Sequence, residues 1–134
     1  MSGHLDVPAV FERYAAAWAA HDPDAILALH SPDTTFWLHL DQPAAHGHDA
    51  VRAVFVHLFD AWPELGIDVH RLLTGADHWT LDWTLVSVLT DPGGARRPVR
   101  IRCVDLVTPD ADGLVSRKDS FVDHPQALRA LAPG

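Results

Sequence analysis

The sequence predicts a single domain of the α+β class, in which three N-terminal helices pack on a curved antiparallel sheet. Its length of 134 residues fits one domain, and a chain of this size can bury a real core. The first half shows apolar residues at helical spacing, whereas the second half alternates apolar and polar residues between strong turn signals. We therefore expect residues 1–134 to form one domain, with most of the sheet built from the second half.

The first two helices are predicted by the residues at which they begin. Asp6 is a helix-capping residue and Pro8 lies in the first turn, which predicts a helix from about residue 7. Its apolar residues share one face at helical spacing: Val7, Val10, Phe11, Tyr14 and Trp18. The pair Asp22-Pro23 repeats the start signal and predicts a short second helix that ends before Pro32.

A strand and a third helix are predicted next. Residues 34–40 read TTFWLHL, which is rich in β-branched and aromatic residues and is typical of a strand. A polar loop with Pro43 and Gly47 follows. A third helix is predicted from about Asp49 to Trp62, before Pro63. Its apolar face consists of Val51, Val54, Phe55, Leu58, Phe59 and Trp62.

The second half predicts a run of antiparallel strands. Four segments have strand character: residues 66–74, 78–90, 98–108 and 114–122. The turn Asp91-Pro92-Gly93-Gly94 separates the second and third of them, and Asp110-Ala111-Asp112-Gly113 predicts a hairpin between the third and fourth. A short C-terminal helix is predicted to begin at Asp123-His124-Pro125. Helices followed by such a meander indicate helices on one face of a sheet.

Composition excludes several classes of protein. With 48% hydrophobic and 21% charged residues, the chain is not disordered. Cys103 is the single cysteine, which rules out a disulfide scaffold and a thiolate zinc finger within one chain. No apolar run reaches the ~18 residues of a membrane span. Residues 1–6 show neither the basic start nor the apolar run of a secretory signal, so we expect a cytoplasmic protein without membrane contact.

The charge balance makes nucleic acid an unexpected partner. The formal net charge is −8 with histidine neutral, and phosphate binding needs clustered basic residues. The one basic cluster contains Arg96, Arg97, Arg100 and Arg102. It lies in and after a turn, and it is a weak candidate for an anion site.

Four groups of residues resemble a known family when they are taken in order. They are Arg13-Tyr14 with His21-Asp22-Pro23-Asp24, then Gly47-His48-Asp49-Ala50-Val51-Arg52, then Asp82-Trp83-Thr84, and last Val104-Asp105 with Asp112-Gly113 and Phe121-Val122-Asp123. Over residues 7–131 the chain resembles the SnoaL-like branch of the NTF2-like (cystatin-like) superfamily, which includes polyketide cyclases and is related to ketosteroid isomerases. The resemblance implies a cone-shaped fold with an apolar cavity inside a bent sheet, and a homodimer formed through the outer face of that sheet.

Asp105 is the sharpest candidate for chemistry. The two-residue period of a strand places it on one apolar face with Val99, Ile101, Cys103 and Val107. A carboxyl group on such a face is desolvated, and it can then hold a proton near neutral pH and donate or transfer it. The alternative is an ion pair or a backbone cap inside the sheet.

Tyr14 is the second candidate, on the apolar face of the first predicted helix. The resemblance to ketosteroid isomerases implies that Tyr14 and a protonated Asp105 together hold the oxygen of a developing enolate. The alternative is a core tyrosine whose hydroxyl finds any partner. Where those isomerases carry their general-base aspartate, this chain has Leu38. The Asp-Arg-Asp set of the related epoxide hydrolases is also absent, since Trp83, Leu85 and Ser120 stand near those positions.

Lys118 and His39 are further candidates for proton transfer. Lys118 is the only lysine, and an inward side chain would either pair with Asp105 or act as a desolvated amine nucleophile. The alternative is a solvated charge at a sheet edge beside Arg117 and Asp119. Phe36, Leu38 and Leu40 form the apolar alternation, which directs His39 to the other face unless a twist at the sheet edge brings its ring inside.

We expect no metal and no cofactor. His39, Asp41, His46, His48 and Asp49 carry metal-binding groups, but they span a loop without helical i, i+4 spacing. An apolar cavity suits a flat, hydrophobic ligand instead. The candidate ligand-binding residues are Trp18, Trp37, Phe55, Phe59, Trp62, Trp79, Trp83 and Ser120.

These observations favour a cofactor-free acid/base enzyme. Its substrate would be a small hydrophobic, polyketide-like carbonyl compound, and its reaction a cyclisation, isomerisation or dehydration through an enolate. A fold alone does not decide function, so two alternatives remain. One is a non-catalytic protein of the same fold that binds a small molecule, which the leucine at position 38 favours. The other is a structural or partner-binding dimer, which a filled core without a cavity would favour.

Overall fold

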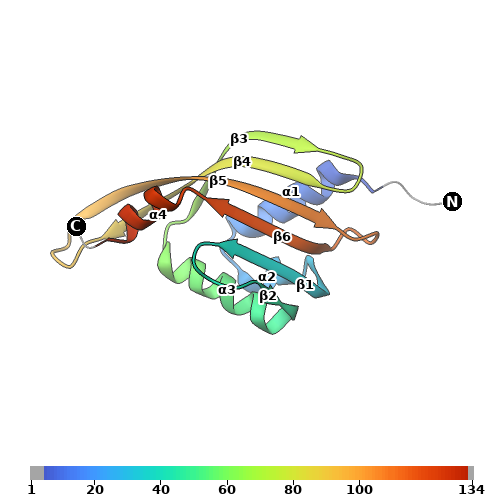
Figure 1. Cartoon of the computed structure of the whole chain (residues 1–134), viewed down its shortest axis with the longest axis horizontal. Helices are drawn as coiled ribbons and strands as arrows, with labels where there is room; N and C mark the ends of the chain where they lie inside the picture. The colour runs from blue at the N-terminus through green and yellow to red at the C-terminus, as the bar shows by residue number, and fades with distance from the viewer. Residues whose placement is uncertain (1–4, 133–134) are drawn as a thin grey trace.

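A computed structural model of the protein describes residues 5–132 and shows four helices and six strands within them (Figure 1). The helices are α1 (Val7–Ala19), α2 (Pro23–Leu27), α3 (Gly47–Ala61) and α4 (His124–Leu131). The strands are β1 (His30–His39), β2 (Ala45–His46), β3 (Gly66–Thr74), β4 (Trp79–Thr90), β5 (Arg96–Pro109) and β6 (Val115–Val122). The strands form one curved sheet in the order β2-β1-β6-β5-β4-β3. The predicted α+β class is confirmed.

Helices α1 and α2 begin where the capping residues predict. The Asp6 carboxylate accepts a hydrogen bond from the Ala9 backbone N–H at 3.1 Å. The Asp22 carboxylate accepts from the backbone N–H groups of Asp24 and Ala25 in the same way. These bonds satisfy N–H groups that have no partner inside the helix. The buried face of α1 consists of Val7, Val10, Tyr14 and Trp18, which directs Tyr14 and Trp18 toward the sheet.

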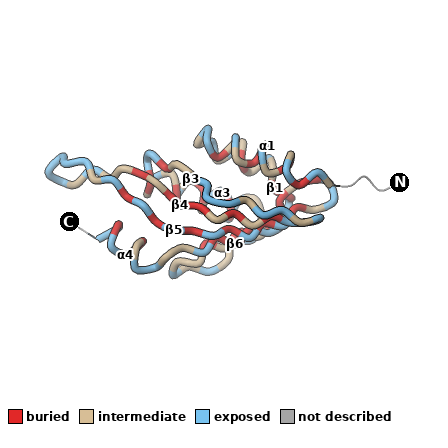
Figure 2. Tube along the Cα trace, turned by 90° about the horizontal axis from the view of Figure 1, so that it is seen from above, coloured by how far each residue is buried: buried red, intermediate tan, exposed pale blue. Residues whose placement is uncertain are grey.

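Strands β3 to β6 form the predicted antiparallel meander. β4 and β5 pair along twelve residues of each strand, from Trp79 opposite Val107 to Thr90 opposite Arg96. Along β5 buried and exposed residues alternate, as the red and blue bands of Figure 2 show. The buried set of β5 includes Val99, Ile101, Cys103, Asp105 and Val107. The predicted inward direction of Asp105 is therefore confirmed.

Three details of the sheet differ from the prediction. β1 begins at His30, four residues earlier than expected, and Pro32 lies within it at an irregularity between His30 and Thr35. The short strand β2 was predicted as loop. β1 pairs with β6 in parallel, so the sheet is mixed rather than wholly antiparallel. Partners so far apart in the sequence leave no local pattern that would reveal the pairing.

The core lies between the helices α1 and α3 and one face of the sheet (Figures 1 and 2). We call this the inner face, and it carries Phe36, Asp105 and Lys118. The ring centroids of Trp18 on α1 and Phe55 on α3 are 5.3 Å apart in an edge-to-face arrangement. Such aromatic pairs bury large apolar areas and fix the two helices relative to each other.

Candidate active site

A cavity of about 380 Å³ opens between α1 and β3 on the inner face. We call it the main cavity; Phe11, Trp18, Ile67 and Trp79 are among the side chains of its mostly apolar wall. Tyr14 and Asp105 contribute polar groups to it. A second space of about 40 Å³, the inner pocket, shares Trp18, Ile67 and Asp105 with the main cavity. The site is therefore an apolar chamber with a few converging polar groups, as in small-molecule sites.

Asp105 is buried between the two spaces, with 4% of its surface exposed. One carboxylate oxygen, Oδ2, lies 3.7 Å from Nζ of Lys118. The other, Oδ1, is buried and has no hydrogen-bond partner among the described residues. A buried polar atom without a partner is costly, so a ligand that donates a hydrogen bond to Oδ1 would be favoured.

Lys118 lies on the inner face of β6 and is 5% exposed, which shows that the predicted alternative of a solvated edge charge is wrong. Its Nζ lies over the rings of Trp18, Tyr14 and Phe36, at 4.2, 4.8 and 5.4 Å from their centroids. It also donates a hydrogen bond of 3.3 Å to the Tyr14 hydroxyl. Asp105 on β5 and the aromatic faces together compensate the ammonium charge in this dry environment.

Tyr14 joins Lys118 to a buried histidine. The Tyr14 hydroxyl lies 2.8 Å from Nε2 of His30, and Nδ1 of His30 lies 2.9 Å from the Thr34 hydroxyl. Burial raises the pKa of Tyr14 above its ordinary value, while the charge of Lys118 opposes that shift. Tyr14 is therefore a neutral phenol at neutral pH.

His30 is 1% exposed, and its burial lowers its pKa to about 3, with a contribution from the charge of Lys118. Its neutral ring donates at one nitrogen and accepts at the other. Where Nδ1 accepts from Thr34, Nε2 donates to the Tyr14 oxygen and leaves the Tyr14 proton free for a ligand. Where Tyr14 donates to Nε2 instead, its hydroxyl proton is bound to His30 and cannot be donated to a ligand. Sequence reasoning misses His30, because the predicted strand begins only at residue 34, whereas β1 begins at His30.

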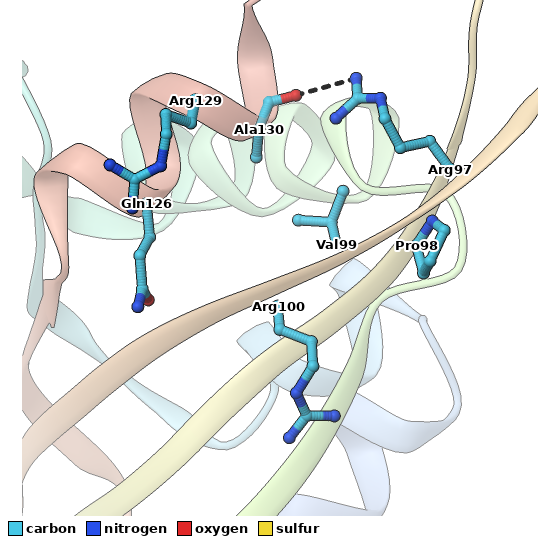
Figure 3. Close-up of a pocket in the computed structure, with 7 residues that line it drawn as sticks. All are labelled: Arg97, Pro98, Val99, Arg100, Gln126, Arg129 and Ala130. Carbon is cyan, nitrogen blue, oxygen red and sulfur yellow. Dashed lines mark hydrogen bonds between the residues drawn. The ribbon is translucent and has the colours of Figure 1, made fainter.

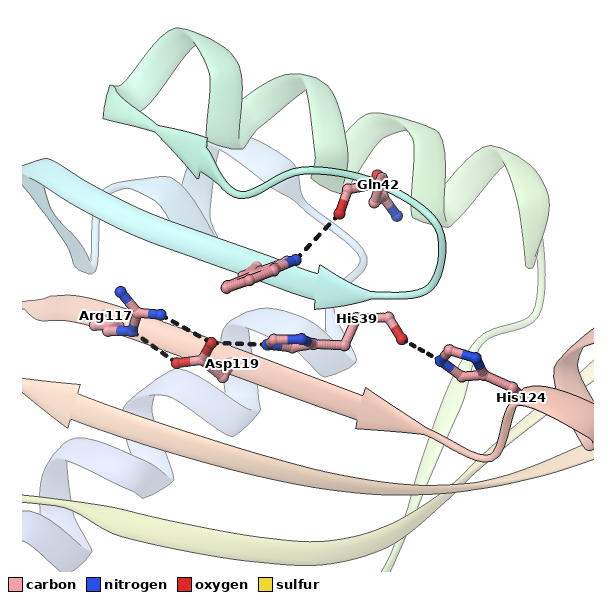
Figure 4. Close-up of polar contacts among 6 residues, drawn as sticks. His39, Gln42, Arg117, Asp119 and His124 are labelled. Atoms are coloured by element: carbon pink, nitrogen blue, oxygen red, sulfur yellow. Dashed lines mark hydrogen bonds and ion pairs between the residues drawn. The ribbon is translucent and has the colours of Figure 1, made fainter.

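His39 and Trp37 lie on the opposite, outer face of the sheet, as the alternation of β1 predicts, and no twist brings His39 inside as its candidacy for proton transfer required. Their neighbours Phe36 and Leu38 point inward, and alternation then directs the two rings outward. His39 stacks between Trp37 and Phe121, with both centroid distances 4.1 Å. Its Nε2 lies 2.9 Å from Oδ1 of Asp119 (Figure 4). Neither ring lines the main cavity or the inner pocket.

The other candidate ligand-binding residues divide into two groups. Trp18 and Trp79 line the main cavity, and Trp18, Trp83 and Ser120 line the inner pocket. Phe55, Phe59 and Trp62 line neither space. Phe55 and Phe59 pack on Trp18 instead, which makes them supports of the cavity wall.

The arginine cluster is not a free anion site. Arg96, Arg97, Arg100 and Arg102 each contact a carboxylate, on Glu64, Asp91, Asp68 and Asp82 respectively. Arg97 also donates to the Ala130 carbonyl of α4 across a shallow depression beside β5 (Figure 3). Within residues 5–132 no group of three or more histidine, cysteine or acidic side chains is placed to hold a metal ion. In the same range no helix is both long and apolar enough to cross a membrane.

Comparisons with solved structures show which fold this is. A protein from Shewanella denitrificans OS-217, assigned to the SnoaL-like polyketide cyclases, aligns with a TM-score of 0.79 at 12% identity, over 93% of this chain and 96% of that one. The epoxide hydrolase/cyclase-like enzyme SalBIII, studied for pyran ring formation in the polyether salinomycin, aligns with a TM-score of 0.77 at 20% identity, over 94% and 97%.

A third neighbour, from Catenulispora acidiphila DSM 44928, has a ketosteroid isomerase-like fold and was solved in complex with trimethylamine. It aligns with a TM-score of 0.70 at 19% identity, over 85% of each chain. A comparison with curated proteins found no match. The expected NTF2-like, ketosteroid isomerase-like architecture is confirmed by these alignments. Residues 11–118 match the family of the SnoaL-like domain, and the chain therefore belongs to the SnoaL-like family.

Proposed function

We propose that this protein is a cofactor-free acid/base enzyme that acts on a small hydrophobic carbonyl compound of the polyketide type. The observation that carries the proposal is the Asp105 carboxylate, whose buried Oδ1 has no hydrogen-bond partner in residues 5–132 and lies where an apolar chamber also presents Tyr14 and Lys118. A carboxylate in such a chamber can remove a proton from the carbon beside a carbonyl group. The cavity also argues against a purely structural role, which a filled core would have favoured.

The polar groups divide into a proton carrier and stabilisers of negative charge. Asp105 takes the proton from carbon, and the Tyr14 hydroxyl and Lys118 ammonium group lie together, 3.3 Å apart, where both can donate to the enolate oxygen. An enolate formed in this way can lead to cyclisation, isomerisation or dehydration. The names of the neighbours, a polyketide cyclase group and a cyclase-like enzyme of pyran ring formation, support chemistry of this class.

The test is hydrogen exchange at the carbon beside a carbonyl group. With 2-acetonaphthone as the probe in deuterated buffer, wild-type protein should accelerate exchange of the methyl hydrogens, followed by proton NMR. Asp105→Asn should slow that exchange by about 100-fold or more, because it removes the base. The matched control is Asp82→Asn on the outer side of β4, where Asp82 is paired with arginines. Equal rates in wild type and in Asp105→Asn would contradict the assignment.

The alternative function is non-catalytic binding of a small hydrophobic molecule. The presence of Leu38 in the wall of the inner pocket favours it, since the resemblance places a general base there. Under this alternative the wild-type protein binds the probe, as fluorescence of its tryptophans would report, but does not accelerate exchange. Asp105→Asn would then change affinity only.

We also propose that a second copy of the chain covers the outer face. Val104, Leu106 and Phe121 are exposed there, at 37%, 45% and 42% of their surface. Together with the stacked ring of His39 they form a contiguous apolar strip on the adjacent strands β5, β6 and β1. Exposed apolar strips of this kind are typical of interaction surfaces.

The expected cytoplasmic location stays a prediction.

A further inference from the structure

We infer that Lys118 is a nucleophilic amine that condenses with the carbonyl group of the ligand to form an imine. The inference rests on the proposed function in that both place a carbonyl compound in the main cavity. It goes further because it assigns covalent chemistry to Lys118 rather than charge stabilisation alone.

The shape of the site favours this assignment. Lys118 lines the inner pocket together with Cys103, Asp105 and Ser120, and that pocket holds only about 40 Å³. A space of this size accepts one small functional group but no ring. A flat ligand would therefore keep its ring in the main cavity of about 380 Å³ and direct its carbonyl end toward the amine.

The contacts of Lys118 leave its nitrogen available. Its three N–H donors have one acceptor within hydrogen-bond distance among the described residues, the Tyr14 hydroxyl at 3.3 Å. Oδ2 of Asp105 lies at 3.7 Å, close enough for a proton to pass by way of a small shift of either side chain. Removal of that proton gives the neutral amine, which is the nucleophilic form.

The charges around Lys118 suit the protonated imine as well as the ammonium group of the unreacted lysine. A protonated imine carries one positive charge on the same nitrogen as the ammonium group. Asp105 at 3.7 Å and the rings of Trp18 and Tyr14 at 4.2 and 4.8 Å surround this nitrogen with groups that favour a positive charge on it. Condensation therefore creates no new buried charge, which is the usual obstacle to covalent chemistry in a dry site. Cys103 is a poor competitor, since burial and the charge of Asp105 raise the pKa of its thiol to about 12.

The step balances without any further reactant. Lys118 first gives one proton to the Asp105 carboxylate, and its lone pair then forms a bond to the carbonyl carbon while the C=O electron pair moves to oxygen. A second proton passes from nitrogen to that oxygen, with the Tyr14 hydroxyl in position to relay it. Protonated Asp105 then returns its proton to the new hydroxyl group, which leaves as water as the C=N bond forms. The products are a protonated imine, one water molecule and the Asp105 carboxylate.

The chain offers an unusually clear test, because Lys118 is its only lysine. We would incubate the native protein with 2-naphthaldehyde and sodium cyanoborohydride, which reduces a protonated imine to a stable secondary amine. Intact mass would count the naphthylmethyl groups attached, and peptide mapping would assign them to Lys118 or to the N-terminal amine. The same reaction in concentrated urea gives the ratio of the two labels for freely accessible amines.

In native protein we expect about tenfold more label on Lys118, relative to the N-terminal amine, than in urea, because binding places the aldehyde against Nζ. Lys118→Arg keeps the charge and should lose this label. If arginine does not fit the pocket, Lys118→Met serves the same purpose. Wild-type mapping alone decides the matter: an unlabelled Lys118, or a ratio equal to that in urea, would overturn the inference.

The two proposals fail in different ways. If Lys118 is not labelled, but wild-type protein accelerates exchange of 2-acetonaphthone and Asp105→Asn does not, the imine is wrong and the proposed acid/base function stands. If Lys118 is labelled but wild-type protein does not accelerate exchange, the amine is nucleophilic and the proposed acid/base function is wrong.

Discussion

His30 shows how one buried side chain couples the site to the stability of the fold. Its two ring nitrogens connect the Tyr14 hydroxyl to Thr34, and its ring packs against Tyr14 and Phe55. Protonation of His30 would place a second cation near Lys118 in a dry environment. It would also remove the one acceptor nitrogen of the ring, which takes part in the hydrogen bonds from Tyr14 through His30 to Thr34. The neutral ring is therefore part of the folded structure as well as of the site.

Stability should fall when the pH drops below the ordinary pKa of histidine. The pKa of His30 is about 3 in the folded protein against 6.5 for a free histidine, so between these values only the unfolded chain binds the proton. The stabilisation is complete above pH 6.5 and decreases as the pH falls toward about 3, with a slope of up to about 1.4 kcal/mol per pH unit.

Urea denaturation of wild type, His30→Gln and His57→Gln between about pH 7 and about pH 4.5 measures this dependence. His57 is an exposed histidine on α3 and serves as the control. His30→Gln should lower stability at neutral pH and flatten its pH dependence, whereas His57→Gln should leave the wild-type slope. A slope that His30→Gln does not change would assign the proton uptake to other groups.

The residue scale also shows what a sequence can and cannot predict about the site. The directions of Tyr14 and Asp105 were predicted because the period of a single helix or strand decides them. The sequence leaves the direction of the Lys118 side chain open, because the burial of β6 depends on its neighbours β1 and β5. His30 was missed because the irregular start of β1 is held in place by pairing with Val115, far away in the chain.

At the scale of elements, α1 matters most because it brings Tyr14 and Trp18 to the cavity. Its start is fixed by local chemistry: a capping carboxylate at Asp6 and a proline in the first turn. Elements with such signals were found at the predicted positions, whereas the two-residue strand β2 has none and exists through its pairing with β1. Capping and turn residues at the ends of an element therefore predict where it lies in the sequence, whereas the strands it pairs with depend on residues elsewhere in the chain.

Asp6→Ala should lower the free energy of unfolding by about 1 kcal/mol, because the Ala9 backbone N–H loses its acceptor. Asp6→Asn keeps a capping oxygen and should stay close to wild type. Midpoints of urea denaturation compare the three proteins. If alanine and asparagine destabilise equally, the loss would come from the charge rather than from the cap.

At the scale of the whole molecule, the sheet separates two surfaces with different tasks. The inner face carries the site, while the outer face presents apolar side chains between ion pairs such as Arg117 with Asp119. The alternation of β5 builds both at once, since Asp105 points inward between Val104 and Leu106, which point outward. A dimer through the outer face would therefore rest directly behind the strands that carry the candidate site.

Leu106→Glu should convert the proposed dimer to a monomer, because two copies of a buried, unpaired carboxylate would face the interface. Sedimentation velocity at micromolar concentration would report the change in mass. Leu128→Glu is the matched control, since Leu128 is equally apolar and 56% exposed but lies on α4. A wild-type protein that sediments as a monomer would contradict the proposed dimer.

The place of β6 in the sheet has a consequence for how the chain folds during synthesis. β6 is the last strand to be made, yet it lies between β1 and β5 and joins the two halves of the sheet. The contact from Lys118 to Tyr14 spans 104 residues, so its loop closes late and slowly. Every aromatic ring of the cavity wall precedes β6 in the sequence. A nascent chain that already carries all these rings still lacks the candidate site until β6, the last of the six described strands, leaves the ribosome.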